Sequence, residues 1–208
     1  MKQPKFKDAI RGMTLKQKRE YIWDYYKIHI ISVLFVAAVG LYSAYEFSVR
    51  RDTYLNVFLT GGAVTMERVS DLNYQLNDIL LTEEEQGSYT VLVQFNQFSF
   101  ADEMIAVDAA QQLSVFLTTG EIDVLIVDEP TFEAYHQQGF LMPLSQVGFD
   151  FSGHPTFEAG QVGYGVAASE LDGFEEIFPE GMGSWIAVFP ITSNRPDQVE
   201  RFLDTVLN

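Results

Sequence analysis

Beyond residue 52, short apolar runs alternate with longer segments whose apolar residues recur every three or four positions. The short runs predict strands and the longer periodic segments predict helices. The predicted strands are 53–59, 89–95 and 122–127, and the predicted helices are 65–80, 102–117 and 130–138. Such an alternation favours a parallel sheet with right-handed crossovers. We therefore expect one three-layer α/β domain with a mainly parallel sheet, extending over residues 53–208.

The last third of the chain has a less regular pattern. Apolar runs at 160–168 and 185–191 predict two further strands. The segment 194–207 predicts a closing helix, because Pro196 falls in its first turn and its apolar residues share one face.

The longest apolar run, residues 28–47, predicts a transmembrane helix. Its length matches the roughly 20 residues that cross about 30 Å of hydrocarbon. Aromatic residues at 21–26 and at Tyr42 and Tyr45 are typical of the two headgroup levels. Residues 48–52 then form a short linker to the domain.

Two alternatives to a membrane anchor remain for this run. A cleaved signal peptide usually has an apolar region of about 7–15 residues and small residues before its cleavage site, a pattern that Tyr42-Ser43-Ala44 fits poorly. A buried core helix seldom has basic and aromatic flanks. The length and the flanks of the run favour the uncleaved anchor.

The charges are divided by the apolar run. Residues 1–27 contain eight Lys or Arg and three Asp or Glu, whereas residues 52–208 contain three arginines and 25 acidic residues, a net charge of −22. By the positive-inside rule, residues 1–27 form a cytoplasmic basic juxtamembrane segment. The acidic domain is therefore expected to be extracellular, and the protein a single-pass protein of the cell membrane.

The composition of the domain excludes several functions. Its acidity argues against nucleic-acid binding, which needs a basic surface. The chain has no cysteine, so it has neither disulfides nor a thiol nucleophile. No Gly-x-Ser-x-Gly, His-Glu-x-x-His or phosphate-binding glycine loop occurs in the sequence. We expect no enzyme activity and no cofactor.

Residues 120–144 (GEIDVLIVDEPTFEAYHQQGFLMPL) closely resemble the cleft-lining segment of the extracellular solute-binding protein family with the type 2 fold. Residues 162–166 and 185–189 are similar to that family's passage towards its second lobe and its return. Only 16 residues separate Ala168 from Trp185, where the family has a complete second lobe. The resemblance therefore implies a single lobe.

The segment before the apolar run has a resemblance of its own. Residues 13–27 (MTLKQKREYIWDYYK) resemble the juxtamembrane leader of a group of uncharacterised single-span proteins from Gram-positive bacteria. The basic residues of such a segment either orient the anchor or bind anionic lipid or a partner.

The candidate ligand-binding residues follow three predicted strands, because ligands of open parallel sheets bind beyond the carboxyl ends of the strands. Glycines there permit close backbone approach, amides supply hydrogen bonds, and carboxylates attract cations. These residues are Thr60, Gly61, Gly62, Asn96, Gln97, Asp128 and Glu129. The alternative is that they belong to ordinary polar loops.

No metal site is expected. The acidic run 83–85 lacks the spaced oxygen ligands of a calcium loop, and is expected to be a solvated charge cluster. His136 and His154 have no His or Cys partner at ligand spacing.

Three functions agree with these observations. The first is a non-enzymatic module, held at the membrane, that docks onto a membrane or envelope protein. The second is a small-molecule receptor or transporter accessory, in which dimerisation supplies the missing lobe. The third is a cell-envelope hydrolase that uses acidic residues.

Overall fold

The computed structural model describes residues 14–61, 64–96, 106–174, 177–178 and 184–207. The chain consists of two compact units, residues 1–50 and residues 51–208.

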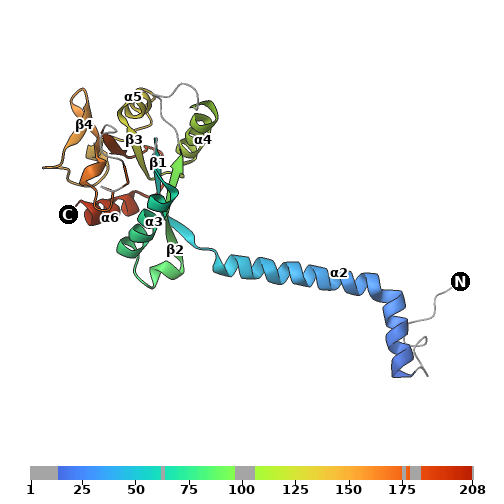
Figure 1. Ribbon diagram of the computed structural model, residues 1–208. Helices are drawn as coiled ribbons and strands as arrows, with labels where there is room; N and C mark the ends of the chain where they lie inside the picture. The colour runs from blue at the N-terminus through green and yellow to red at the C-terminus, as the bar shows by residue number, and fades with distance from the viewer. Residues whose placement is uncertain (1–13, 62–63, 97–105, 175–176, 179–183, 208) are drawn as a thin grey trace. The chain divides into compact units, whose positions relative to one another are not determined.

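The described part of the first unit, residues 14–50, contains the long helix α2 (Leu15–Val49) (Figure 1). Thr14 caps it and exchanges hydrogen bonds with Gln17, which satisfies backbone donors of the first turn. Within α2 the 21 residues from Tyr26 to Glu46 have a mean hydropathy of 1.9, with charges only near the two ends, and none of this stretch is buried against the described part of the protein. This helix is long enough and apolar enough to be a membrane anchor or a signal sequence.

The second unit is built on one six-stranded sheet in the order β2-β1-β3-β6-β5-β4. Its strands are β1 (Asp52–Thr60), β2 (Tyr89–Asn96), β3 (Val124–Asp128), β4 (Thr156–Ala159), β5 (Val162–Ala167) and β6 (Trp185–Val188). The strand β1 pairs in parallel with β2 and β3, whereas β3, β6, β5 and β4 pair with one another in antiparallel fashion. The sheet is therefore mixed, and the expectation of a mainly parallel sheet was wrong.

One of the antiparallel pairs, the β4–β5 hairpin, has a local cause. The chain turns back between β4 and β5 at Gly160, whose φ of +74° suits a tight turn. The strand β6 then lies between β5 and β3, and the described residues of the connection from β5 contain only the 3₁₀ turn that follows Ala167. As a result, β6 is antiparallel to both of its neighbours, β5 and β3.

Helices cover both faces of the sheet, so the domain has three layers (Figure 1). Side chains of α3 (Met66–Leu80) and α6 (Pro196–Val206) belong to one apolar core, and those of α4 (Ala106–Thr119) and α5 (Glu129–Gln137) to the other. Short 3₁₀ turns are η1 (Glu85–Gly87), η2 (Leu144–Gln146) and η3 (Ala168–Glu170). Consecutive residues of β3 alternate between the cores, as a strand covered on both faces must.

The outer edge of the sheet at β2 is partly closed by a side chain. The Asn77 carboxamide of α3 accepts from the Val91 N–H and donates to the Val91 carbonyl, both at 2.9 Å. Asn73 adds a second donor to the same carbonyl at 3.1 Å. These amides take the place of a neighbouring strand at Val91, which limits pairing with another chain.

The start of β1 is tied to the C-terminal helix. Arg201 of α6 makes two hydrogen bonds to the Glu85 carboxylate, at 3.0 and 3.2 Å, and its guanidinium lies 5.5 Å from the centre of the Tyr54 ring. The hydrogen bond from Arg201, with two from Thr82, lowers the pKa of Glu85 to about 2. This contact links α6 and η1 to the first strand.

Candidate functional site

The carboxyl ends of β1, β2 and β3 lie side by side at one edge of the sheet. Thr60 is the register partner of Asn96, and β3 ends beside them at Asp128. The first residue of β6, Trp185, is paired with Asp128 and so joins the same edge. We call this set, with Gly61 and Glu129, the carboxyl edge.

The Thr60 side chain serves the sheet itself. It is fully buried, and its Oγ1 donates to the carbonyl oxygen of Ile126 at 3.1 Å. Its hydroxyl therefore links β1 to β3 and is not accessible to a ligand from the solvent.

Gly61 is closely covered by an aromatic ring. Its φ is +120°, and a Cβ placed on it would lie 2.0 Å from Cη2 of Trp185. Glycine is therefore required here by its backbone conformation and by the indole. The close approach that the sequence suggested for a ligand is made in this structure by a side chain of the protein.

Trp185 forms an aromatic pair that the sequence reasoning missed. Its ring stacks on Phe178 with centroids 4.0 Å apart and an interplanar angle of 16°. The Nε1 atom of Trp185 is buried and has no hydrogen-bond partner among the described residues. A buried indole N–H usually has a partner, so this donor is a notable polar feature of the carboxyl edge.

The acidic residues of the edge begin helix α5. Asp128 is half-buried and caps the helix by accepting from the Thr131 N–H at 3.1 Å. Glu129, in the first turn, is exposed to solvent. Asp128 therefore has a structural task, while Glu129 can meet a ligand or partner.

A hollow of about 430 Å³ lies along α3. Arg68 lies in it and donates to the Ile177 carbonyl at a long 3.5 Å, one residue before Phe178. The hollow is lined by Arg68, Asp71, Leu72, Tyr74, Gln75, Gly173 and Ile177. Arg195 and Arg201 are engaged in ion pairs, whereas Arg68 has no ion pair with any residue that the structure describes.

Two of the seven candidate residues, Gly62 and Gln97, lie outside the described residues. The structure brings the other five to one edge of the sheet and adds Trp185 and Phe178 to them. In the sequence, Trp185 was distinguished only as the first residue of a predicted apolar strand. Its place at the carboxyl edge follows from the antiparallel pairing of β6 with β3, which the sequence pattern did not predict.

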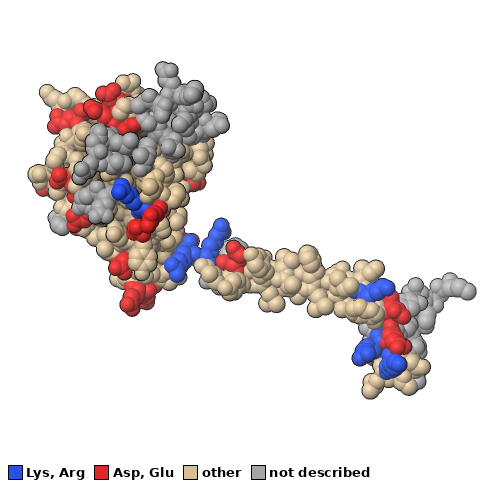
Figure 2. Space-filling view, viewed as in Figure 1, with Lys and Arg blue, Asp and Glu red and all other residues tan. Residues whose placement is uncertain are grey.

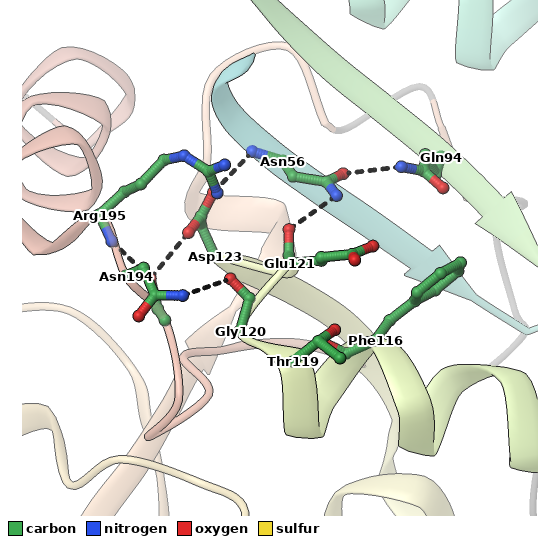
Figure 3. Close-up of polar contacts among 10 residues, drawn as sticks. Asn56, Gln94, Phe116, Thr119, Gly120, Glu121, Asp123, Asn194 and Arg195 are labelled. Atoms are coloured by element: carbon green, nitrogen blue, oxygen red, sulfur yellow. Dashed lines mark hydrogen bonds and ion pairs between the residues drawn. The ribbon is translucent and has the colours of Figure 1, made fainter. Parts of the chain in front are cut away.

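A polar cluster lies at the opposite, amino-terminal end of β3 (Figure 3). The fully buried Asp123 accepts from the Asn56 N–H at 2.8 Å, from the Ser193 hydroxyl at 2.8 Å and from Arg195 at 3.0 Å. The Asn56 carboxamide extends the cluster to the Glu121 carbonyl at 2.8 Å and to Gln94 at 3.3 Å. The cluster therefore joins β1, β2, β3 and the start of α6.

The Asp123 carboxylate is held by contacts within the protein. Burial raises its pKa, while the hydrogen bonds from Ser193 and Asn56 and the nearby Arg195 act in the opposite direction. Both of its oxygens are occupied, and the adjoining turn is tightly packed: a Cβ on Gly120 would lie 2.4 Å from the Thr192 carbonyl. We interpret this cluster as a latch between the sheet and α6.

The remaining residues singled out in the sequence are dispersed. Glu85 pairs with Arg201, and Glu83 and Glu84 are exposed. His136 packs edge-on against Tyr164 at 4.5 Å, and His154 lies 4.0 Å from Glu170. Over the described ranges, no three His, Asp or Glu side chains are grouped so as to hold a metal ion.

No family model, curated protein or solved structure matches this chain.

Proposed function

We propose that this chain is a single-pass membrane protein whose extracytoplasmic domain is a non-enzymatic docking module, related to one lobe of a solute-binding protein. The observation that carries the proposal is the uncovered apolar run of α2, which is followed after only two residues by β1. A domain attached so closely to an anchor remains beside the membrane proteins with which it would interact. The charge division of the sequence supports a cytoplasmic N-terminus.

The carboxyl edge is the docking surface in this proposal. It offers the exposed Glu129 and the half-buried Asn96 beside the stacked rings of Trp185 and Phe178. Aromatic residues surrounded by polar groups are typical of binding surfaces. The partner is a membrane or envelope protein with a basic surface, since the domain is strongly acidic.

A photo-cross-linking residue at Glu129 tests the docking surface in cells. We expect one identified membrane or envelope protein to be captured from this position, and not from Glu158 on the edge strand β4, which is also exposed to solvent. The purified partner should then compete with the cross-link in reconstituted membranes. Equal capture from both positions would contradict the proposal.

The anchor requires its own test. The intact chain of 23.6 kDa should stay in the membrane fraction after extraction with alkaline carbonate. Protease added outside protoplasts should then degrade the domain. A shorter, released chain would identify residues 26–46 as a signal sequence instead.

A small-ligand receptor is the second candidate, because the hollow beside Arg68 lies within the volume range of ligand sites. Dimerisation would supply the second lobe. A saturable thermal shift of the full chain with one compound from a panel of metabolites and cations, lost in Arg68→Gln, would favour this candidate over the docking module.

A further inference from the structure

The first turns of α2 carry an excess of positive charge. Residues 14–27 contain four basic side chains and two acidic ones, Glu20 and Asp24. The basic residues are Lys16, Lys18, Arg19 and Lys27. Figure 2 shows coloured side chains gathered at the beginning of α2, followed by a long stretch without charge. None of these four cations forms an ion pair with another residue in the described part of the chain.

This segment and the apolar run belong to one continuous helix. Trp23 and Tyr26 lie where the charges give way to apolar residues, with 56% and 39% of their surfaces exposed. Such rings prefer the headgroup level of a bilayer, where an apolar body and a polar tip are both solvated. Lys16, Lys18 and Arg19, one to two turns before Trp23, would then lie at the depth of the lipid phosphates.

We infer that residues 14–27 bind the headgroups of anionic phospholipids in the leaflet that α2 enters. The inference rests on the proposed membrane anchor and adds a lipid partner to it. We choose anionic lipid as the partner because of charge complementarity: basic side chains beside a membrane span attract anionic lipid headgroups. Residues 52–208, with 25 acidic residues and three arginines, have no comparable excess of positive charge.

The two tryptophans of the chain allow a direct measurement. The full chain with Trp185→Phe, in which Trp23 is the single tryptophan and is excited selectively, is reconstituted into vesicles of 70% phosphatidylcholine and 30% phosphatidylglycerol. Either lipid carries bromine on its upper acyl chains, at the same mole fraction of brominated lipid. The reciprocal Trp23→Phe protein measures any quenching of Trp185.

We expect brominated phosphatidylglycerol to quench Trp23 more strongly than brominated phosphatidylcholine. The affinity of the segment for phosphatidylglycerol, divided by its affinity for phosphatidylcholine, should be about five or more. One cation supplies a factor of about five at an anionic surface. The ratio of the two affinities should fall towards one in 0.5 M NaCl, which screens the charges. Equal quenching by the two lipids in dilute salt would overturn the inference and leave the anchor intact.

Matched variants separate charge from structure. Replacing Lys16, Lys18, Arg19 and Lys27 by glutamine should bring the ratio close to one, because glutamine keeps the helix and removes the charge. The control variant Glu20→Gln/Asp24→Asn should keep or increase the ratio. A ratio unchanged by the glutamine variant would also overturn the inference. Absence of quenching by either lipid, together with release by alkaline carbonate, would instead refute the anchor on which it rests.

Discussion

The Trp185 indole lies where a side chain on Gly61 would have to be. A Cβ on Gly61 would come within 2.0 Å of the ring, and the φ of +120° is itself unfavourable for other residues. The ring therefore fixes the identity of the residue that follows β1.

Gly61→Ala should lower the free energy of unfolding by about 3 kcal/mol, through overpacking and backbone strain. Urea denaturation of the full chain in detergent micelles measures the loss. Gly139→Ala is the control, because Gly139 also has a positive φ, +75°, but a Cβ placed on it would meet no described atom within 4 Å. The free energy of unfolding should fall clearly less in Gly139→Ala than in Gly61→Ala. Equal decreases in the two variants would mean that the Trp185 indole does not contribute to the cost of Gly61→Ala.

Arg195→Met should destabilise the domain by about 3 kcal/mol, because it leaves the carboxylate of Asp123 buried without its cation. Urea denaturation at pH 7 measures this change. Arg201→Met, which breaks the more exposed pair with Glu85, should cost less. In the double variant Asp123→Asn/Arg195→Met the loss should be smaller than the sum of the two single losses. If the two single losses simply add in the double variant, Asp123 and Arg195 do not stabilise each other, which would contradict the latch.

The Asp123 carboxyl also predicts a pH dependence. Burial raises its folded-state pKa above the ordinary value of 3.8, so its protonated form stabilises the fold below that value and this stabilisation is lost as the pH rises through the folded pKa. The destabilisation caused by Arg195→Met should therefore shrink in acid. Denaturation midpoints of both proteins between pH 7 and pH 4 test this, and a constant difference would contradict it.

Glu85 should show the opposite dependence. Its pKa is lowered from 4.5 to about 2. Its contribution to the stability of the fold is therefore fully present above pH 4.5 and is lost as the pH falls through 2. Arg201→Gln removes the largest cause of the shift. The Glu85 carboxyl, followed by NMR, should then titrate closer to 4.5. A titration that stays near 2 would assign the shift to Thr82 instead.

Asn77→Ala should both destabilise the domain and open its edge. It leaves the Val91 N–H without its side-chain acceptor, at a cost of about 2 kcal/mol. Asn73→Ala is milder, because Asn77 continues to donate to the Val91 carbonyl. Sedimentation should reveal concentration-dependent association of Asn77→Ala alone. Association of both variants to the same degree would argue against a specific role for Asn77.

Much of the fold could be predicted from local patterns. The strands near 53–59, 89–95 and 122–127 and the helix near 65–80 are all present, because their periodicity reflects burial against the two cores. The helix predicted at 102–117 is described from Ala106 onward, and residues 102–105 lie outside the described part.

The direction of the later strands could not be obtained in the same way. The strand predicted at 160–168 is present as β5, but its hairpin partner β4 was not predicted. Gly160 between two short runs was a usable hairpin signal. The insertion of β6 beside β3 depends on contacts about sixty residues apart, and no local pattern encodes it.

The same limit applies to the carboxyl edge. Thr60, Asn96 and Asp128 were predictable because parallel strands end together. Trp185 reaches that edge by running in the opposite direction, so a parallel scheme placed it elsewhere. The Asp123 latch was missed for a related reason, since Arg195 and Ser193 are more than sixty residues away from it in the sequence.

The two-residue connection between α2 and β1 has a mechanical consequence. Tension on the helix would enter the domain at Asp52, the first residue of a strand held by ladders to β2 and to β3. A pull along that strand loads many backbone hydrogen bonds in shear at once, instead of opening them one after another. The chain therefore enters the domain through a strand that has a parallel neighbour on each side, and not through an edge strand.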